Sequence, residues 1–553
     1  MDFLKKNHRL LFYSSWLILN LLQAWSTGLF HDEAYYWVYS KFPAWGYFDH
    51  PPMIAMLIKA GTNVFSGELG VRLFIVILNV LTIFIIEKLL NKKDPWLFYG
   101  ICASIAVAQI GGMIAVPDLP LLFFVSLYFL LYKRFTENMN LLNTFLLGVG
   151  ISLMLYSKYH GVLIVFFTLL SNPRLLLRYQ VYIAALISIL LFLPHIYWQF
   201  EHELPSVQYH LFERNASTYK FGFTTEYILG QIALAGPLIG WLLIYASMKY
   251  KPVSVTEKAM KWSLAGIYIF FLLSTFKGRV EANWTIPAFV ALIVLSHQYI
   301  SSKPVFKRWV YRTVPFTLLL VFAARIFMGL ELPKSSWLSK DEFHGNQKWV
   351  HAIEARAKNE AVVVLNSYQT PSKYWFYSGK PAFGLNTPAY RRNNYNFWPI
   401  EREFIGKPAL VMGAFDSAYL NDRYPDKPLH ESGSMHVPFY YSLSAIQLKD
   451  IEARQAGSKV VMRFRAAIPD EYLVLLNQEP IDTAKLYVAV MYDNKPVEYI
   501  PTGYKINQLN SGKAVNEISF PVKLEARYIG LKLAISSVIP GRPSVNSTNF
   551  KIR

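Results

Sequence analysis

The chain has a single cysteine and few charged residues, and both shortages limit what it can be. One cysteine, Cys102, excludes an intrachain disulfide and a metal site built from several thiolates of one chain. Charged residues make up 16% of the 553 residues, whereas hydrophobic residues make up 53%. This composition is too apolar for an ordinary soluble protein of this length and predicts a membrane protein.

Long apolar segments account for the composition. A helix that spans a bilayer needs about 20 mostly apolar residues. The candidate segments are 10–29, 70–90, 96–115, 119–132, 141–157, 160–172, 180–199, 225–247, 260–276, 284–300 and 311–331. We therefore predict a polytopic α-helical membrane protein with about eleven transmembrane helices, two of them short.

Acidic residues are fewer than basic ones, 36 against 55, and the formal net charge is +19. Lysine and arginine gather in alternate loops, namely 1–9, 88–95, 133–140, 171–180, 248–261 and 301–312. The positive-inside rule makes these loops cytoplasmic and places the N-terminus inside. The excess of positive charge therefore lies in the predicted cytoplasmic loops, beside the membrane lipids. It does not require a nucleic-acid partner.

Beyond about residue 333 no apolar segment is long enough to span a membrane. Residues 347–358 are expected to be helical, 362–365 and 409–412 to be short buried strands, and alternating strand patterns follow from about 435. The predicted parts are a transmembrane domain at 1–332, an α/β region at 333–430 and a β-rich, sandwich-like module at 431–553. The parity of the spans places both C-terminal parts outside the cytoplasm.

The first predicted outer loop, residues 30–69, holds an unusual group of ionisable side chains. Asp32 and Glu33 directly follow the first span, and Asp49 and His50 come later in the same loop. Charges beside hydrocarbon are costly and indicate function, and a carboxylate at an apolar interface can act as a general base. Asp32 could instead be a helix N-cap, but this would not explain the other acids.

Further ionisable residues fall in later outer loops. Lys158, Lys277 and Arg279 are cations on the outer face, against the charge bias, and suit a phosphate group. Asp118 lies between two prolines before the fourth span. The alternative interpretations are that Asp118 caps this span and that Lys158 snorkels to the interface.

The loop 200–214 is predicted to be a lid or substrate loop, in which any single residue is expected to be solvated rather than functional. Its ionisable residues are Glu201, His202, Glu203, His210, Glu213 and Arg214. The histidines of the chain show no H-x-x-x-H spacing, so whether a divalent metal takes part stays open. The acids and cations together suit transfer of a group from a lipid phosphate to a hydroxyl. A base would remove the hydroxyl proton, and cations would neutralise the departing phosphate.

At these residues the sequence resembles the GT-C superfamily of membrane glycosyltransferases. It is most similar to the branch that contains protein O-mannosyltransferases and the lipid A aminoarabinose transferase. The matching motifs are Asp32-Glu33-Ala34-Tyr35-Tyr36, Tyr47-Phe48-Asp49-His50-Pro51-Pro52, Pro117-Asp118-Leu119-Pro120 and Ser157-Lys158-Tyr159-His160-Gly161.

The resemblance implies a polyprenyl-phosphate-linked sugar donor and inversion at the anomeric carbon. It also implies an extracytoplasmic site on the bacterial inner membrane and a lipid, glycan or protein acceptor. Asp32 would be the general base and Asp49 the second acid. Lys158 would contact the donor phosphate, and Asp118 would orient that lysine or line the cavity. His50 departs from the aminoarabinose transferase, which has a lysine there. The full set of predicted site residues is Asp32, Glu33 and Asp49 for catalysis, and Tyr35, His50, Asp118, Lys158, His160, Lys277, Arg279 and Glu281 for substrate binding.

Two other classes of protein compete with this prediction. A multi-pass transporter is expected to carry ionisable residues near mid-membrane and often an internal repeat, whereas here they lie at one face and no repeat is visible. A membrane-anchored binding protein that acts through its β-rich tail would leave the acids of the first loop unexplained.

Overall fold

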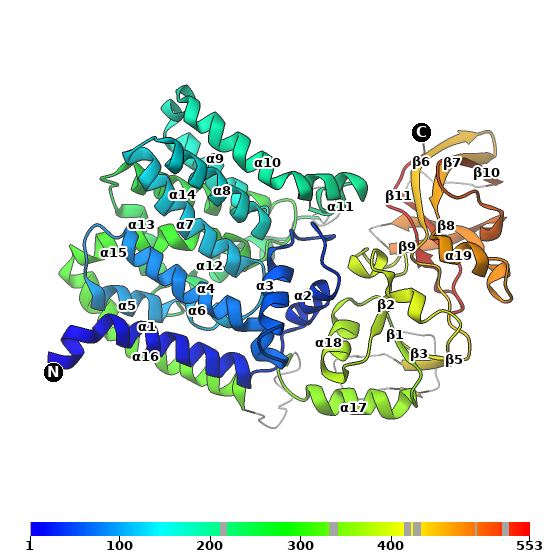
Figure 1. Cartoon of the computed structure of the whole chain (residues 1–553), viewed down its shortest axis with the longest axis horizontal. Helices are drawn as coiled ribbons and strands as arrows, with labels where there is room; N and C mark the ends of the chain where they lie inside the picture. The colour runs from blue at the N-terminus through cyan, green and yellow to red at the C-terminus, as the bar shows by residue number, and fades with distance from the viewer. Residues whose placement is uncertain are drawn as a thin grey trace. The chain divides into compact units, whose positions relative to one another are not determined.

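The structure, a computed structural model, describes residues 2–210, 218–330, 341–413, 422–423, 433–492, 495–521 and 530–552. Glu213, Arg214 and the predicted boundary at 332/333 lie outside the described residues. The chain forms two compact units (Figure 1). The helical unit comprises Met1–Lys334 and Glu342–His344, and the C-terminal unit comprises Ser335–Asp341 and Gly345–Arg553.

The helical unit has a helix, or a broken pair of helices, at every predicted span. These are α1 (Asp2–Ser26), α4 (Gly67–Leu89), α5 (Pro95–Ser104) with α6 (Ala106–Gln109), α7 (Asp118–Glu137), α8 (Leu141–Ser157), α9 (Gly161–Ser171), α10 (Tyr179–Glu201), α12 (Phe221–Ala235) with α13 (Gly240–Lys249), α14 (Val255–Ser274), η4 (Ala282–Ala288) with α15 (Phe289–Ser301), and α16 (Pro304–Gly329). Among the described residues, five helices are long and apolar enough to cross a membrane, or up to seven if each bent pair is one span. The helical class is confirmed, whereas the number eleven stays a prediction.

Burial separates the inner helices from the outer ones. The most apolar window of η4 with α15 is 89% buried, but those of α10 and α16 are only 17% and 22% buried. Apolar side chains of α10 and α16 are exposed in the described structure, as expected where hydrocarbon replaces water. In α16, Arg325 donates to Asn20 Oδ1 of α1 at 3.0 Å, which links two helices that run side by side (Figure 1).

Two short helices, α2 (His31–Lys41) and α3 (Met53–Thr62), separate α1 from α4. They form most of the first predicted outer loop, and α2 carries Asp32 and Glu33 in its first turn. A further short helix, α11 (Pro205–Gln208), follows α10. The predicted loops are therefore partly helical, and Asp32 and Glu33 lie in a helix.

The C-terminal unit begins with α17 (Asn346–Ala357) and a mixed sheet of order β2-β1-β3-β5-β4. Its strands are β1 (Ala361–Leu365), β2 (Ala382–Leu385), β3 (Ala409–Gly413), β4 (Asp422–Arg423) and β5 (Gly433–Val437), and α18 (Gln369–Ser378) joins β1 to β2. β1 pairs in parallel with β2 and β3, whereas β5 is antiparallel to β3. The predicted helix 347–358 and the two predicted buried strands are confirmed.

Two antiparallel sheets complete this unit, in the orders β10-β7-β6 and β12-β11-β8-β9. The strands are β6 (Gln447–Ala456), β7 (Lys459–Ala467), β8 (Lys485–Tyr492), β9 (Lys495–Lys505), β10 (Val515–Pro521), β11 (Gly530–Ile535) and β12 (Ser544–Val545). Side chains from both sheets, such as Phe464 and Val488, share one apolar cluster. The strand-rich tail is confirmed, whereas the sandwich and the three-part domain division stay predictions.

Glu401, in the short helix η7 (Pro399–Glu403), joins the mixed sheet region to the β-rich region. Its buried carboxylate accepts hydrogen bonds from the backbone N–H groups of Ser442 and Ser444 at 3.0 Å and from the Tyr472 hydroxyl at 2.9 Å. The hydroxyls of Ser442 and Ser444 donate to it as well. A buried carboxylate without a cation requires such a set of donors.

We expect Glu401→Gln to weaken the C-terminal unit by about 3 kcal/mol, because an amide NH₂ would face donors that now point at oxygen. The measurement is the urea concentration at which this unit of the full-length chain becomes protease-sensitive. Glu403→Gln, an exposed change in the same short helix, is the matched control. Equal resistance of both variants would show that the Glu401 network adds no stability.

Candidate active site

A cavity of about 1060 Å³ lies in the helical unit. Its polar lining comes from loops that the sequence predicts to be outer and from the adjoining helix ends: His50, Lys158, Tyr159, His160, His195, Gln199, Ser206, His210, Ser274, Lys277 and Trp284. Its apolar lining comes from α9, α10, α14 and the start of α11: Val162, Leu163, Phe192, Ile196, Leu204, Val207, Phe270, Phe271 and Leu273. Four of the predicted substrate-binding residues, His50, Lys158, His160 and Lys277, therefore meet in one space.

Lys158 and Asp118 form a buried ion pair at the cavity. Lys158 Nζ lies 2.7 Å from Asp118 Oδ1, and both side chains are almost fully buried. Asn283 Nδ2 donates to the other carboxylate oxygen at 3.1 Å. Asp118 is therefore held from two sides, and it fixes the ammonium of a lysine that lines the cavity. This arrangement argues against snorkelling for Lys158, because a snorkelling lysine places its charge in water.

The first predicted outer loop reaches the cavity through His50, which is 8% exposed, and the neighbouring Asp49 is 6% exposed. The Tyr39 hydroxyl of α2 donates to Asp49 Oδ1. Burial, together with the Asp49 carboxylate, raises the pKa of Tyr39 well above its ordinary value, so the phenol remains a donor. His210 Nε2 donates to the Asp49 backbone carbonyl at 2.9 Å. The Asp49 side chain and backbone are thus held from different elements.

A second network ties the loop 45–48 to α10 and α11. His195 of α10 donates from Nδ1 to the Trp45 carbonyl at 2.7 Å, and its Nε2 lies 2.9 Å from the Tyr159 hydroxyl. Ser206 Oγ donates to the Phe48 carbonyl at 2.9 Å and accepts from Gln199 at 2.8 Å.

Glycine is required at position 46 by this close approach. A Cβ there would lie 2.4 Å from the Trp198 ring and 2.9 Å from His195 Nδ1. The sequence analysis considered His195 only as a possible metal ligand and gave no role to Gln199. Their spacing of four residues inside an apolar helix, which puts two polar side chains on one face, was the available signal.

Glu33 is not among the described residues that line the cavity, and it binds Arg72 of α4. Arg72 Nε donates to Glu33 Oε1 at 2.7 Å, and a terminal nitrogen of Arg72 pairs with Oε2. The backbone N–H groups of Ala115 and Phe30 donate to the same carboxylate at 2.7 Å and 2.9 Å. Since both oxygens accept two bonds each and both side chains are fully buried, Glu33 is poorly placed to take up a proton from a substrate.

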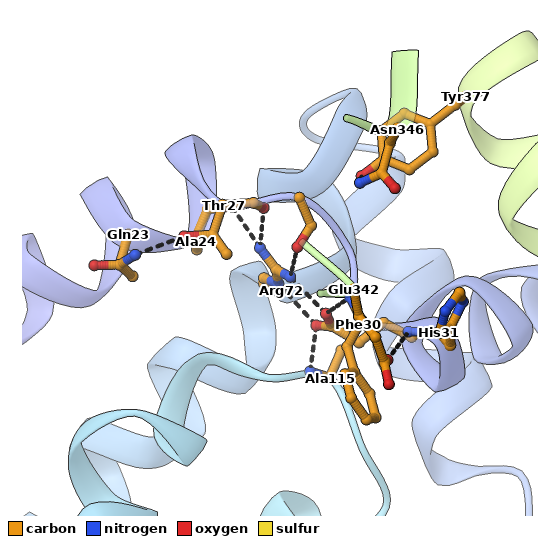
Figure 2. Close-up of polar contacts among 12 residues, drawn as sticks. Gln23, Ala24, Thr27, Phe30, His31, Arg72, Ala115, Glu342, Asn346 and Tyr377 are labelled. Atoms are coloured by element: carbon orange, nitrogen blue, oxygen red, sulfur yellow. Dashed lines mark hydrogen bonds and ion pairs between the residues drawn. The ribbon is translucent and has the colours of Figure 1, made fainter. Parts of the chain in front are cut away.

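Arg72 also binds the end of α1. Its terminal nitrogens donate to the backbone carbonyls of Ala24 and Thr27 (Figure 2). One of them also donates to the Gly28 carbonyl. The last carbonyls of a helix lack partners within the helix and carry partial negative charge. The guanidinium therefore caps α1 while its fork holds Glu33.

The other predicted residues are more scattered. Asp32 is half-buried in the first turn of α2, and the buried Tyr35 packs edge-on against Tyr39 at 4.9 Å. Arg279 is exposed and lies 3.3 Å from Glu226, and Glu281 is exposed. None of these four predicted residues is among the described residues that line the cavity. Among the described residues, no group of three or more His, Cys, Asp or Glu side chains is placed to hold a metal ion.

Known proteins resemble this chain in sequence and in fold. Residues 49–198 match the family described as dolichyl-phosphate-mannose-protein mannosyltransferase. The lipid A galacturonosyltransferase RgtD of Rhizobium johnstonii is 24% identical over 305 residues, which cover 51% of this chain and 63% of RgtD. The match thus spans less than two thirds of that relative.

Two solved structures share the architecture, both of ArnT from Cupriavidus metallidurans. The structure bound to undecaprenyl phosphate has a TM-score of 0.55 and the apo structure one of 0.57. Each is 12% identical and covers 78% of this chain and 98% of ArnT. The chain has a GT-C fold. The resemblance to the aminoarabinose transferase branch of GT-C proteins, predicted from the sequence, is confirmed.

We expect Glu33→Gln to destabilise the helical unit by about 3 kcal/mol or more, because it leaves the Arg72 guanidinium buried without a counter-charge. The measurement is the unfolding temperature of the purified full-length protein in detergent. Glu68→Gln, which changes a half-buried glutamate in the first turn of α4, is the control. If Glu33→Gln unfolds at the wild-type temperature, the pair does not stabilise this unit.

Proposed function

We propose that the chain is an integral membrane glycosyltransferase that moves a sugar from a polyprenyl-phosphate donor to an acceptor hydroxyl outside the cytoplasm, with inversion. The observation that carries this proposal is the cavity, which joins apolar walls suited to an isoprenoid chain with a basic group suited to a phosphate. The ArnT structure bound to undecaprenyl phosphate supports a lipid-phosphate donor for a chain with this fold.

Lys158 and Lys277 are the proposed cations at the donor phosphate. Both line the cavity, and Lys158 is held in place by Asp118. We leave out Arg279, which the sequence analysis grouped with them, because its guanidinium is exposed and faces Glu226. As the bond from the anomeric carbon to the phosphate breaks, negative charge grows on the phosphate, and positive groups fixed beforehand favour that state.

Asp32 is the proposed general base, with Asp49 as the second acid of the loop. We no longer assign Glu33 to the catalytic residues and propose that it is a positioning residue. Its four hydrogen bonds fix the first turn of α2, where Asp32 lies. In the reaction, the carboxylate takes the proton of the acceptor hydroxyl as its oxygen bonds to the anomeric carbon. The phosphate leaves with the electron pair of the broken bond.

The acceptor is proposed to be a lipid, a glycan or a protein outside the cytoplasm, at the bacterial inner membrane. The relative named as a lipid A galacturonosyltransferase favours a lipid acceptor among these. The C-terminal unit is proposed to serve access or positioning of the acceptor, because the proposed chemistry is complete within the helical unit.

We expect Asp32→Asn to lower turnover by about 10² or more with the fold retained, because the amide keeps the size of the side chain but cannot accept the proton. The assay follows polyprenyl phosphate released from a polyprenyl-phosphate sugar. Asp49→Asn is measured in parallel. If Asp32→Asn turns over at the wild-type rate while Asp49→Asn is inactive, Asp49 is the base.

We expect Lys158→Met to raise the KM for the donor at least about tenfold and to leave the KM for the acceptor nearly unchanged, because it removes a cation at the phosphate. Lys258→Met, which changes an exposed lysine of α14 away from the cavity lining, is the control. An increase confined to the acceptor KM would place Lys158 at the other substrate.

A further inference from the structure

Transfer of a sugar changes the charge of the donor phosphate. In the donor, the phosphate is a diester with one negative charge. When the bond from the anomeric carbon to the phosphate oxygen breaks, the electron pair stays on that oxygen and the product is a monoester. A phosphate monoester has a second pKa near 6 and carries close to two charges at neutral pH. The site must therefore offset about one additional negative charge.

The lysines of the cavity supply less positive charge than their number suggests. Lys158 is paired with Asp118 at 2.7 Å, so the two side chains together are neutral. Lys277 is exposed, and water and salt screen a charge in that position. The remaining basic groups among the described lining residues are histidines: His50, His160, His195 and His210.

The histidines differ in how they are bound. His195 donates from one ring nitrogen to a carbonyl, and its other nitrogen faces the Tyr159 hydroxyl, so it is committed to the network that holds the loop. His50 and His210 lie together at Asp49, with ring centroids 6.4 Å apart. His210 donates from Nε2 to the Asp49 carbonyl. Since a carbonyl cannot donate, Nε2 carries a proton in either charge state, and a second proton at Nδ1 makes the ring cationic.

The charged and titratable groups around this pair come from several elements. Tyr36 of α2 lies 5.6 Å from His50, and Tyr159 lies 5.8 Å from His210, between ring centroids. The others are Asp49, Tyr209, Lys158, His160 and Lys277. The Asp49 carboxylate favours the protonated pair, the lysines oppose it, and an anion in the cavity favours it further.

We propose that His50 and His210 form a protonatable pair that binds the donor phosphate and offsets the charge gained on transfer, an inference that rests on the glycosyltransferase function proposed above. Histidine is the side chain whose charge ordinarily changes between pH 5 and 8. Donor binding should then be strong when the pair is protonated and weaken as the pH rises. The pair thus gives the cavity a cation whose charge depends on pH.

The test is binding of a polyprenyl phosphate methyl ester to the full-length protein in lipid nanodiscs between pH 5.5 and 8.5. This diester keeps one negative charge over the whole pH range. Lysine and carboxylate side chains with ordinary pKa values also keep their charges over this range. The wild-type affinity should fall about tenfold or more as the pH rises. In His50→Gln/His210→Gln the affinity should vary less than about twofold over the same range.

Two controls assign the effect to the pair. His202→Gln changes a histidine that stacks on Trp198 and is not among the described lining residues, and it should keep the wild-type pH profile. His160→Gln removes another histidine of the cavity lining and is compared with the double variant. A profile lost in His160→Gln but kept in the double variant would overturn the assignment.

The wild-type profile tests the inference without relying on any variant that could misfold. Binding of the diester at one affinity across the range would overturn the histidine inference and leave the proposed function standing. Failure of the diester to bind at any pH would overturn both, because the lipid-phosphate donor itself would then be wrong.

Discussion

The fully buried pair of Glu33 and Arg72 is the constraint on which the helical unit depends most. A guanidinium removed from water is tolerated only when its charge and its N–H groups are met. Here one carboxylate meets the charge, and the carbonyls at the end of α1 accept the remaining hydrogen bonds. Because Glu33 also binds the N–H groups of Phe30 and Ala115, one ion pair fixes the end of α1, the start of α2, α4 and the segment before α7.

Lys158 and Asp118 form the second buried pair, and its geometry serves a different purpose. Arg72 is surrounded by protein groups, whereas Lys158 is paired on one side and borders the cavity on the other. A lysine ammonium is a compact charge with three donors, so one carboxylate does not use all of its hydrogen-bonding capacity. The Glu33–Arg72 pair therefore fixes helices relative to one another. In the Asp118–Lys158 pair, the ammonium keeps hydrogen-bonding capacity on the side that borders the cavity.

The sequence was sufficient to predict the elements whose signal is local. The apolar segments were found as helices, and the motifs around Asp49 and Lys158 fall at the same cavity because loops on one face of a helical bundle lie close together. The sequence analysis did not predict a role for Arg72, because a lone arginine near the start of an apolar helix is typical of the membrane–water interface. For Arg279, sequence position could not show that the guanidinium is exposed and lies 3.3 Å from Glu226. The strand patterns predicted the β-rich tail, but not which strands pair, because pairing depends on long-range contacts.

The first outer loop links the shape of the cavity to the position of the acids. His195 and Ser206 bind its backbone carbonyls, and Gly46 lets the loop pass against Trp198 without room for a side chain. The same short segment then supplies Asp49 and places His50 in the cavity lining. A shift of α10 or α11 would therefore move the carboxylate and the histidine together. The Asp49 carboxylate and the His50 side chain are therefore carried on one fixed segment, which keeps their separation nearly constant.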